Sequence, residues 1–150
     1  MRAIVQRVLK SSVSIGDSEY SSINRGLLVL IGICEEDESE DTEWLVQKIT
    51  NMRIFSDEQG KMNLSLIQIS GEILIVSQFT LHASTKKGNR PSFIASAKPE
   101  KAIPLYNAFI EKCQSITGIG VKTGQFGTDM KISLINDGPV TIILDSKNKE

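Results

Sequence analysis

Two short segments of the chain join an apolar run to groups that could bind or activate a polar substrate. The first is Ser77-Gln78-Phe79-Thr80-Leu81, and the second is Asn136-Asp137-Gly138-Pro139-Val140-Thr141. A strand that ends in hydroxyl and amide groups presents them on a rigid support, which suits a reactive site. Taken alone, a threonine such as Thr80 is more often an ordinary strand residue. The expected catalytic residues are Ser77, Gln78, Phe79 and Thr80.

The rest of the sequence restricts the chemistry severely. His82 is the single histidine, so any catalytic triad would have to use it. Cys34 and Cys113 are far apart in the sequence, and with one histidine they do not form a zinc motif. The acidic segment 35–43 lacks the glycine of a calcium loop and fits a solvated helix start, and no glycine-rich phosphate loop is present. We therefore expect chemistry without a metal or a cofactor.

Gly138-Pro139 lies between two strand-like segments. The ordinary interpretation is a plain turn. An X-Pro bond can also be cis, as about 5–6% are in folded proteins. A cis bond here would give a rigid backbone corner without a side chain.

Two further features could contact a nucleic acid. Lys86, Lys87 and Arg90 lie in a segment that has no acidic residue, which fits either a solvated loop or a set of phosphate contacts. Phe126 precedes Gly127, and an aromatic ring beside a glycine is either part of the core or free to stack on a base.

The supporting elements follow from the apolar pattern. Strands are expected at 2–9, 12–15, 19–23, 27–33, 73–76, 121–126, 131–135 and 140–144. One helix is expected after Ser39, with Trp44, Leu45, Ile49 and Met52 on one side, and a second from Pro99 to Gly118 with Pro104 inside it. This order predicts a mixed α+β fold with a largely antiparallel sheet that curls toward a barrel, and two main helices.

Composition indicates an ordinary globular protein. The chain has 150 residues, of which 40% are hydrophobic and 23% charged, with a formal net charge of −1. This length predicts a single domain over 1–150. The two cysteines lie in apolar surroundings and predict a reducing compartment, and no segment reaches the roughly 20 apolar residues of a membrane span. We expect a cytoplasmic protein.

Taken in order, five motifs resemble the D-aminoacyl-tRNA deacylases. They are the opening MRAIVQRV, the segment 77–81, the loop TKKGNRPSF at 85–93, TGQFG at 123–127, and NDGPVT at 136–141. The resemblance runs along the whole chain and implies the fold of that family. Each motif alone is weak, but five in order are specific.

The resemblance implies hydrolysis of the ester between a D-amino acid, or glycine, and the terminal adenosine of tRNA, by a homodimer without a cofactor. It further implies that segment 77–81 lines the pocket and that a cis Gly138-Pro139 enters the partner's pocket and rejects L-amino acids. Phe126 and Gly127 would receive the adenine, and Lys86, Lys87 and Arg90 would face tRNA. Thr80 would be a nucleophile or, as the resemblance favours, would orient the substrate while the tRNA 2′-hydroxyl activates water.

Two other functions remain open. The runner-up is a nucleic-acid-binding module that uses the basic loop without turnover, and it predicts salt-sensitive binding to RNA or DNA that lacks an aminoacyl group. A purely structural role would leave the hydroxyl cluster at 77–80 without a purpose.

Overall fold

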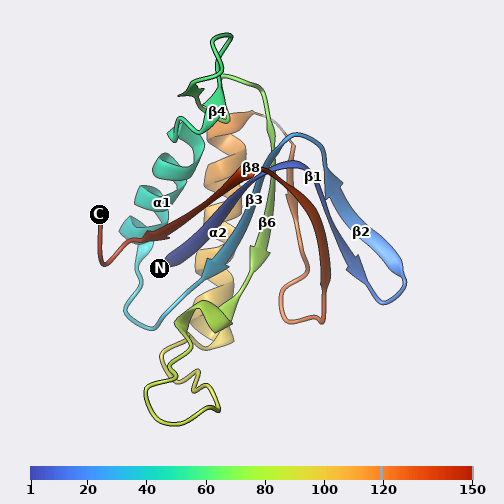
Figure 1. Ribbon diagram of the computed structural model, residues 1–150. Coiled ribbons are helices and arrows are strands. Elements are labelled where there is room, and N and C mark those ends of the chain that lie inside the picture. Colours follow the sequence, from blue (N-terminus) through green and yellow to red (C-terminus); the bar gives the residue numbers. More distant parts are fainter. Residues whose placement is uncertain (119, 150) are drawn as a thin grey trace.

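The computed structural model describes residues 1–118 and 120–149, in which a strongly curved sheet carries two helices on one face (Figure 1). In chain order the elements are β1 (Arg2–Ile15), β2 (Ser18–Ile23), β3 (Gly26–Gly32), α1 (Ser39–Asn51), β4 (Phe55–Ser56), β5 (Met62–Leu64), β6 (Glu72–Ser77), the 3-10 turn η1 (Phe79–His82), α2 (Pro99–Thr117), β7 (Val121–Thr123) and β8 (Lys131–Asp145). Strands β4 and β5 form a separate small hairpin.

The main sheet is mixed and nearly closes on itself. Its order is β2-β1-β3-β6-β7, and β8 pairs with β1 outside this path. Strand β1 is antiparallel to β2, β3 and β8, whereas β6 is parallel to β3 and β7. The Ser21 hydroxyl donates a hydrogen bond to the Thr123 carbonyl at 2.7 Å, which joins β2 to β7 at the two ends of the order. The predicted α+β fold with a curled sheet is therefore confirmed.

Strand β3 is buried on both faces, as its continuous aliphatic run predicts. Its alternate side chains Leu27, Val29 and Ile31 pack toward the helices with the main core. Leu28 faces the opposite side and packs with Leu74 in a second, smaller core inside the curl of the sheet. Two cores on opposite faces hold β3 and its parallel neighbour β6 in a fixed register.

The predicted breaks in the first and last strands are wrong. Strand β1 runs without interruption through residues 10 and 11, and β8 runs through Gly138-Pro139. Proline cannot donate a ladder hydrogen bond, but the Asn136 side-chain amide donates to the carbonyls of Arg7 (3.0 Å) and Val140 (2.9 Å). Register shifts between β1 and β8 on either side of Val8 absorb the remaining irregularity. The predicted strand at 121–126 is also shorter and ends at Thr123.

Helix α2 follows its sequence signals closely. Pro99 occupies the first turn, and Gly118 ends the helix in the left-handed conformation with φ of 61°. Pro104 lies inside α2 and has no backbone N–H to donate. The helical hydrogen bond that it cannot form lies in the exposed first turns, so the helix continues to Thr117. Among the described helices, neither is long and apolar enough to cross a membrane. Both cysteines are buried and free, as the sequence predicts.

The start of helix α1 depends on Asp41. The helix begins at Ser39 with Glu38 at the N-cap, one residue earlier than expected, because a carboxylate rather than the Ser39 hydroxyl caps it. Asp41 accepts hydrogen bonds from the Glu38 backbone N–H at 2.9 Å and from Lys147 at 2.7 Å. Burial opposes ionisation of Asp41, but these bonds and one from Ser146 lower its pKa to about 2. The carboxylate joins the helix start to the segment after β8.

Replacing this carboxylate tests its structural role. We expect Asp41→Asn to lower the free energy of unfolding at pH 7 by about 1–2 kcal/mol, since the cap bond and the Lys147 pair both weaken. Because the folded pKa lies below the ordinary value of 3.8, the difference from the unchanged protein should be full above about pH 4 and vanish toward pH 2. Urea unfolding at several pH values measures this. Glu43→Gln, on the same helix in an exposed pair with Lys112, should change stability by less than about 0.5 kcal/mol.

Candidate functional site

The end of β6 positions the first predicted motif. Ser77 pairs with Ile31 in the parallel ladder, and the Gln78 backbone N–H donates to the Ile31 carbonyl at 2.7 Å. The chain then turns into η1, where the Leu81 N–H donates to the Gln78 carbonyl and the Ala83 N–H to the Thr80 carbonyl. The polar segment therefore follows directly from a buried strand, as the sequence predicts.

Thr80 and Gln78 interact directly. The Gln78 side-chain amide donates to the Thr80 hydroxyl oxygen at 2.6 Å, which leaves the hydroxyl proton of Thr80 available for another acceptor. The backbone N–H groups of Phe79 and Thr80 begin the 3-10 turn, where N–H groups have no partner within the turn itself. The segment thus combines one oriented hydroxyl with two backbone donors.

A pocket lies beside this segment. Its cavity of about 90 Å³ is lined by Ile31, Ile33, Ser77, Gln78, Phe79, Ala97, Ala102, Phe126 and Gly127. A wider hollow of about 380 Å³ adjoins it and is lined by Val76, Ser77, Gln78, Phe79, Gly127, Thr128, Asp129, Met130 and Ile132. The structure therefore brings three predicted catalytic residues together with Phe126 and Gly127, which are about fifty positions away in the sequence.

The aromatic wall of the pocket has a buried support. Phe126 is half-buried and lies 5.9 Å, between ring centroids, from Tyr106 on α2. The Tyr106 hydroxyl donates to the Ile75 carbonyl of β6 at 2.8 Å, and burial raises its pKa far above the usual range. This contact fixes α2 and the Phe126 segment relative to the strand that ends in the polar motif.

The long loop between η1 and α2 carries the predicted basic residues. Lys86, Lys87 and Arg90 are exposed, and the loop extends from the end of the molecule that carries η1 (Figure 1). Two contacts attach the loop to Phe79: Phe93 packs edge-on against its ring, with ring centroids 5.1 Å apart, and the Ser96 hydroxyl donates to its carbonyl at 2.8 Å. The basic side chains are therefore carried by a loop that is anchored on Phe79, within segment 77–81.

Gly138 and Pro139 lie elsewhere in the chain, and the peptide bond between them is cis. Both residues are exposed. Pairing of β8 with β1 places them near Arg7, which is level with Leu27 of β3, whereas Ser77 is level with Ile31 at the other end of that strand. Within one chain, the structure does not bring Gly138-Pro139 into the pocket.

A buried arginine supports this corner. Arg7 is 7% exposed, and its Nε donates to the Asp137 carbonyl at 3.0 Å and pairs with the Asp137 carboxylate at 3.1 Å. Its Nη1 donates to the Ile54 carbonyl at 2.6 Å. Arg7 was not predicted from the sequence. The available signal was a charged residue at a position of β1 where the alternating pattern places buried side chains.

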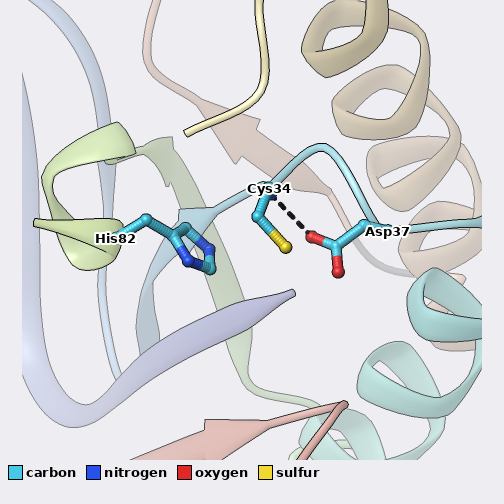
Figure 2. A group of neighbouring side chains, drawn as sticks. All are labelled: Cys34, Asp37 and His82. Atoms are coloured by element: carbon cyan, nitrogen blue, oxygen red, sulfur yellow. Dashed lines mark hydrogen bonds between the residues drawn. The ribbon is translucent and has the colours of Figure 1, made fainter. Parts of the chain in front are cut away.

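Sequence reasoning also did not identify the cluster formed by Cys34, Asp37 and His82 (Figure 2). Burial, followed by the charge of Asp37, raises the pKa of the Cys34 thiol to about 11, and burial lowers the pKa of His82. His82 Nε2 has no hydrogen-bond partner among the described residues. The imidazole is directed at Cys34 (Figure 2), and the Thr80 hydroxyl accepts from Gln78, so His82 Nε2 and Thr80 do not form a hydrogen-bonded pair.

The chain combines a curved mixed sheet, a pocket at the end of a strand and a polar 3-10 turn. Comparisons with known proteins identify the family to which it belongs. The family model described as D-Tyr-tRNA(Tyr) deacylase matches residues 4–145. The D-aminoacyl-tRNA deacylases of Cytophaga hutchinsonii and Parabacteroides distasonis are 63% and 60% identical to the chain over 150 residues, which covers both partners completely in each case.

Two solved structures share the fold of this chain. The c-Myc DNA Unwinding Element Binding Protein matches with a TM-score of 0.91 and 43% identity, over 97% of this chain and 98% of that one. A probable eukaryotic D-amino acid tRNA deacylase has the same fold, with a TM-score of 0.83 and 19% identity over 95% of this chain and 97% of that one. The chain belongs to the D-Tyr-tRNA(Tyr) deacylase family, a family of ester-bond hydrolases.

The Ser96 contact gives a test of how the loop is attached. Removing the hydroxyl in Ser96→Ala should cost about 0.5–1.5 kcal/mol of stability and speed amide exchange across 83–98, because the loop loses its bond to the Phe79 carbonyl. Hydrogen-exchange mass spectrometry measures this. Ser92→Ala is the control, since Ser92 pairs with Ser84 through its backbone. Equal protection of the loop in both variants would contradict the anchoring role.

Proposed function

We propose that this protein hydrolyses the ester bond of D-aminoacyl-tRNA and releases the free D-amino acid and tRNA. The observation that carries the proposal is the pocket at the end of β6, which joins Ser77, Gln78 and Phe79 to Phe126 and Gly127. Family membership supplies the substrate class, since the relatives at 63% and 60% identity are named D-aminoacyl-tRNA deacylases.

The chemistry requires few catalytic groups. An aminoacyl ester is activated, so the protein mainly has to hold the ester, admit one water and stabilise negative charge on the carbonyl oxygen. The water oxygen attacks the carbonyl carbon, the bond to the ribose oxygen breaks, and that oxygen takes a proton as it leaves. The backbone N–H groups of Phe79 and Thr80 are the proposed donors to the oxyanion.

Thr80 is proposed to orient the substrate rather than to attack it. A threonine nucleophile needs a base to take its proton, and the neighbouring side chain that touches the hydroxyl is the Gln78 amide, which is a donor. His82 lies in the cluster with Cys34 and Asp37. In this account the tRNA 2′-hydroxyl activates the water, and the Thr80 hydroxyl proton holds the substrate.

Selection against L-amino acids is proposed to come from a second copy of the chain. Gly138 and Pro139 are exposed and are far from the pocket of their own chain. In a homodimer the corner of one subunit would enter the other's pocket and leave room for an α-hydrogen but not for an L side chain. Because the wall is backbone, it would accept many D-amino acids, and glycine for the same reason.

The tRNA itself is proposed to bind across the pocket and the loop. Phe126 and Gly127 would receive the terminal adenine, with the ring stacking on the base. Lys86, Lys87 and Arg90 would contact phosphates near the acceptor end, since they are exposed on a loop anchored beside Phe79. A tRNA substrate implies that the protein works in the cytoplasm, where aminoacylation takes place.

Turnover of matched substrates tests the proposal. We expect the purified protein to release tyrosine from D-Tyr-tRNA and to leave L-Tyr-tRNA intact. Thr80→Ala should lower the rate on D-Tyr-tRNA by about 10- to 100-fold, since misplacing the ester removes most of the benefit of orientation. Thr85→Ala, an exposed threonine of the adjacent loop, is the matched control and should keep the rate. Equal inertness toward both tRNAs would reject the function.

The alternative function is nucleic-acid binding without turnover. Its support is the similarity to a protein named for binding a DNA unwinding element, which is 43% identical to this chain. This function predicts that the protein binds uncharged RNA or DNA with an affinity that falls steeply with salt. Binding that requires the aminoacylated 3′ end favours the deacylase.

A further inference from the structure

The cluster of Cys34, Asp37 and His82 lies outside the pocket and has no role in the proposed reaction. Cys34 follows β3, Asp37 precedes α1, and His82 ends η1, so three separate elements meet there (Figure 2). One donor atom from each residue lies within 4.8 Å of the others. Thiol, carboxylate and imidazole are the three side-chain types that bind zinc.

His82 supplies a second, independent indication of a ligand. The residue is 8% exposed, and its Nε2 is completely buried without a hydrogen-bond partner among the described residues. A buried polar atom without a partner is costly, and native structures seldom leave one unless something else satisfies it. In Figure 2 the imidazole is directed at the Cys34 sulfur, that is, into the cluster.

We propose that Cys34 Sγ, His82 Nε2 and a carboxylate oxygen of Asp37 form a binding site for Zn²⁺ or a similar divalent transition-metal ion. The fourth position would hold a water molecule, as it does in sites with three protein ligands. When the metal binds, the Cys34 thiol loses its proton to solvent and the sulfur–metal bond forms. No oxidant or other reactant is required.

The donors need only a small adjustment to bind one ion. Bonds of about 2.0–2.3 Å place neighbouring ligands of a tetrahedral zinc roughly 3.3–3.8 Å apart, so the widest separation has to shrink by roughly 1 Å. His82 lies at the end of a short 3-10 turn and Asp37 in a turn before α1, where such movements are easier than within a strand.

Two existing contacts would compete with the metal for Asp37. One carboxylate oxygen pairs with the N-terminal ammonium of Met1, and the other accepts the Cys34 backbone N–H at 2.8 Å. An ion has to share the carboxylate with both donors, so its affinity should lie below that of a dedicated structural zinc site. The same N–H contact holds Asp37 beside Cys34 and so orients it for a metal.

A metal here would act on the proposed active site through η1. His82 is two residues from Thr80, and Cys34 is two residues beyond the end of β3. A metal bound to both residues would attach η1, the turn that contains Thr80, to the end of β3. The binding itself does not depend on the deacylase reaction, so the two can fail separately.

Cobalt binding to tag-free, chelator-treated protein tests the proposal. We expect one Co²⁺ per chain and a thiolate-to-cobalt charge-transfer absorption band, with competition by Zn²⁺. Cys34→Ala should abolish the band, and His82→Ala should weaken binding at least tenfold. Cys113→Ala is the matched control, since Cys113 is an equally free and buried cysteine on α2, and it should keep the band.

A measurement on the unchanged protein guards against variants that do not fold. X-ray absorption of the Zn²⁺-loaded protein should show one sulfur together with nitrogen or oxygen ligands. A zinc ion surrounded only by nitrogen and oxygen, no stoichiometric binding, or a band that survives Cys34→Ala would each overturn the site.

Discussion

The buried guanidinium of Arg7 determines where the Gly138-Pro139 corner lies, and the proposed selectivity depends on that position. Its bonds to Asp137 and to the Ile54 carbonyl hold the middle of β8 against β1. Arg7 is buried, so loss of the Asp137 carboxylate would leave the guanidinium charge without compensation, which is costly. The corner is therefore held away from its own pocket, and only another copy of the chain could bring it to Ser77 and Thr80. In the proposed mechanism this interaction makes a dimer necessary for the selection against L-amino acids.

The position of the pocket depends on a different constraint, the parallel pairing of β3 and β6. Both strands end at the same edge of the sheet, so the 3-10 turn that starts at Phe79 begins at that edge. The first backbone N–H groups of this turn have no partner within the turn and are available to a ligand. Tyr106 fixes α2 to the same strand and brings Phe126 to the opposite wall. In the proposed reaction, positioning of this kind would be sufficient for an activated ester, so no triad would be needed.

Much of this arrangement could be predicted from the sequence. The apolar run of β3, the proline start and glycine end of α2, and the polar end of β6 each have a local physical cause, and all three are present in the structure. The continuity of β8 could not be predicted, because it depends on the Asn136 side chain reaching Arg7 and Val140. The cluster at Cys34 could not be predicted either, since residues 34 and 82 meet only when η1 folds beneath β3. Long-range contacts, rather than local propensity, account for both differences.

If the corner of each subunit completes the pocket of the other, as proposed, mixing subunits with two different substitutions will reveal it. Pro139→Ala should hydrolyse L-Tyr-tRNA as well as D-Tyr-tRNA, and Thr80→Ala should be slower on D-Tyr-tRNA by the roughly 10- to 100-fold given above. When excess Thr80→Ala chains exchange into Pro139→Ala dimers, each active pocket receives an intact corner from its partner. Hydrolysis of L-Tyr-tRNA should then fall, while D-Tyr-tRNA hydrolysis per Pro139→Ala chain should be kept. An unchanged ratio of D to L turnover after mixing would contradict the proposed completion of one subunit's pocket by the other.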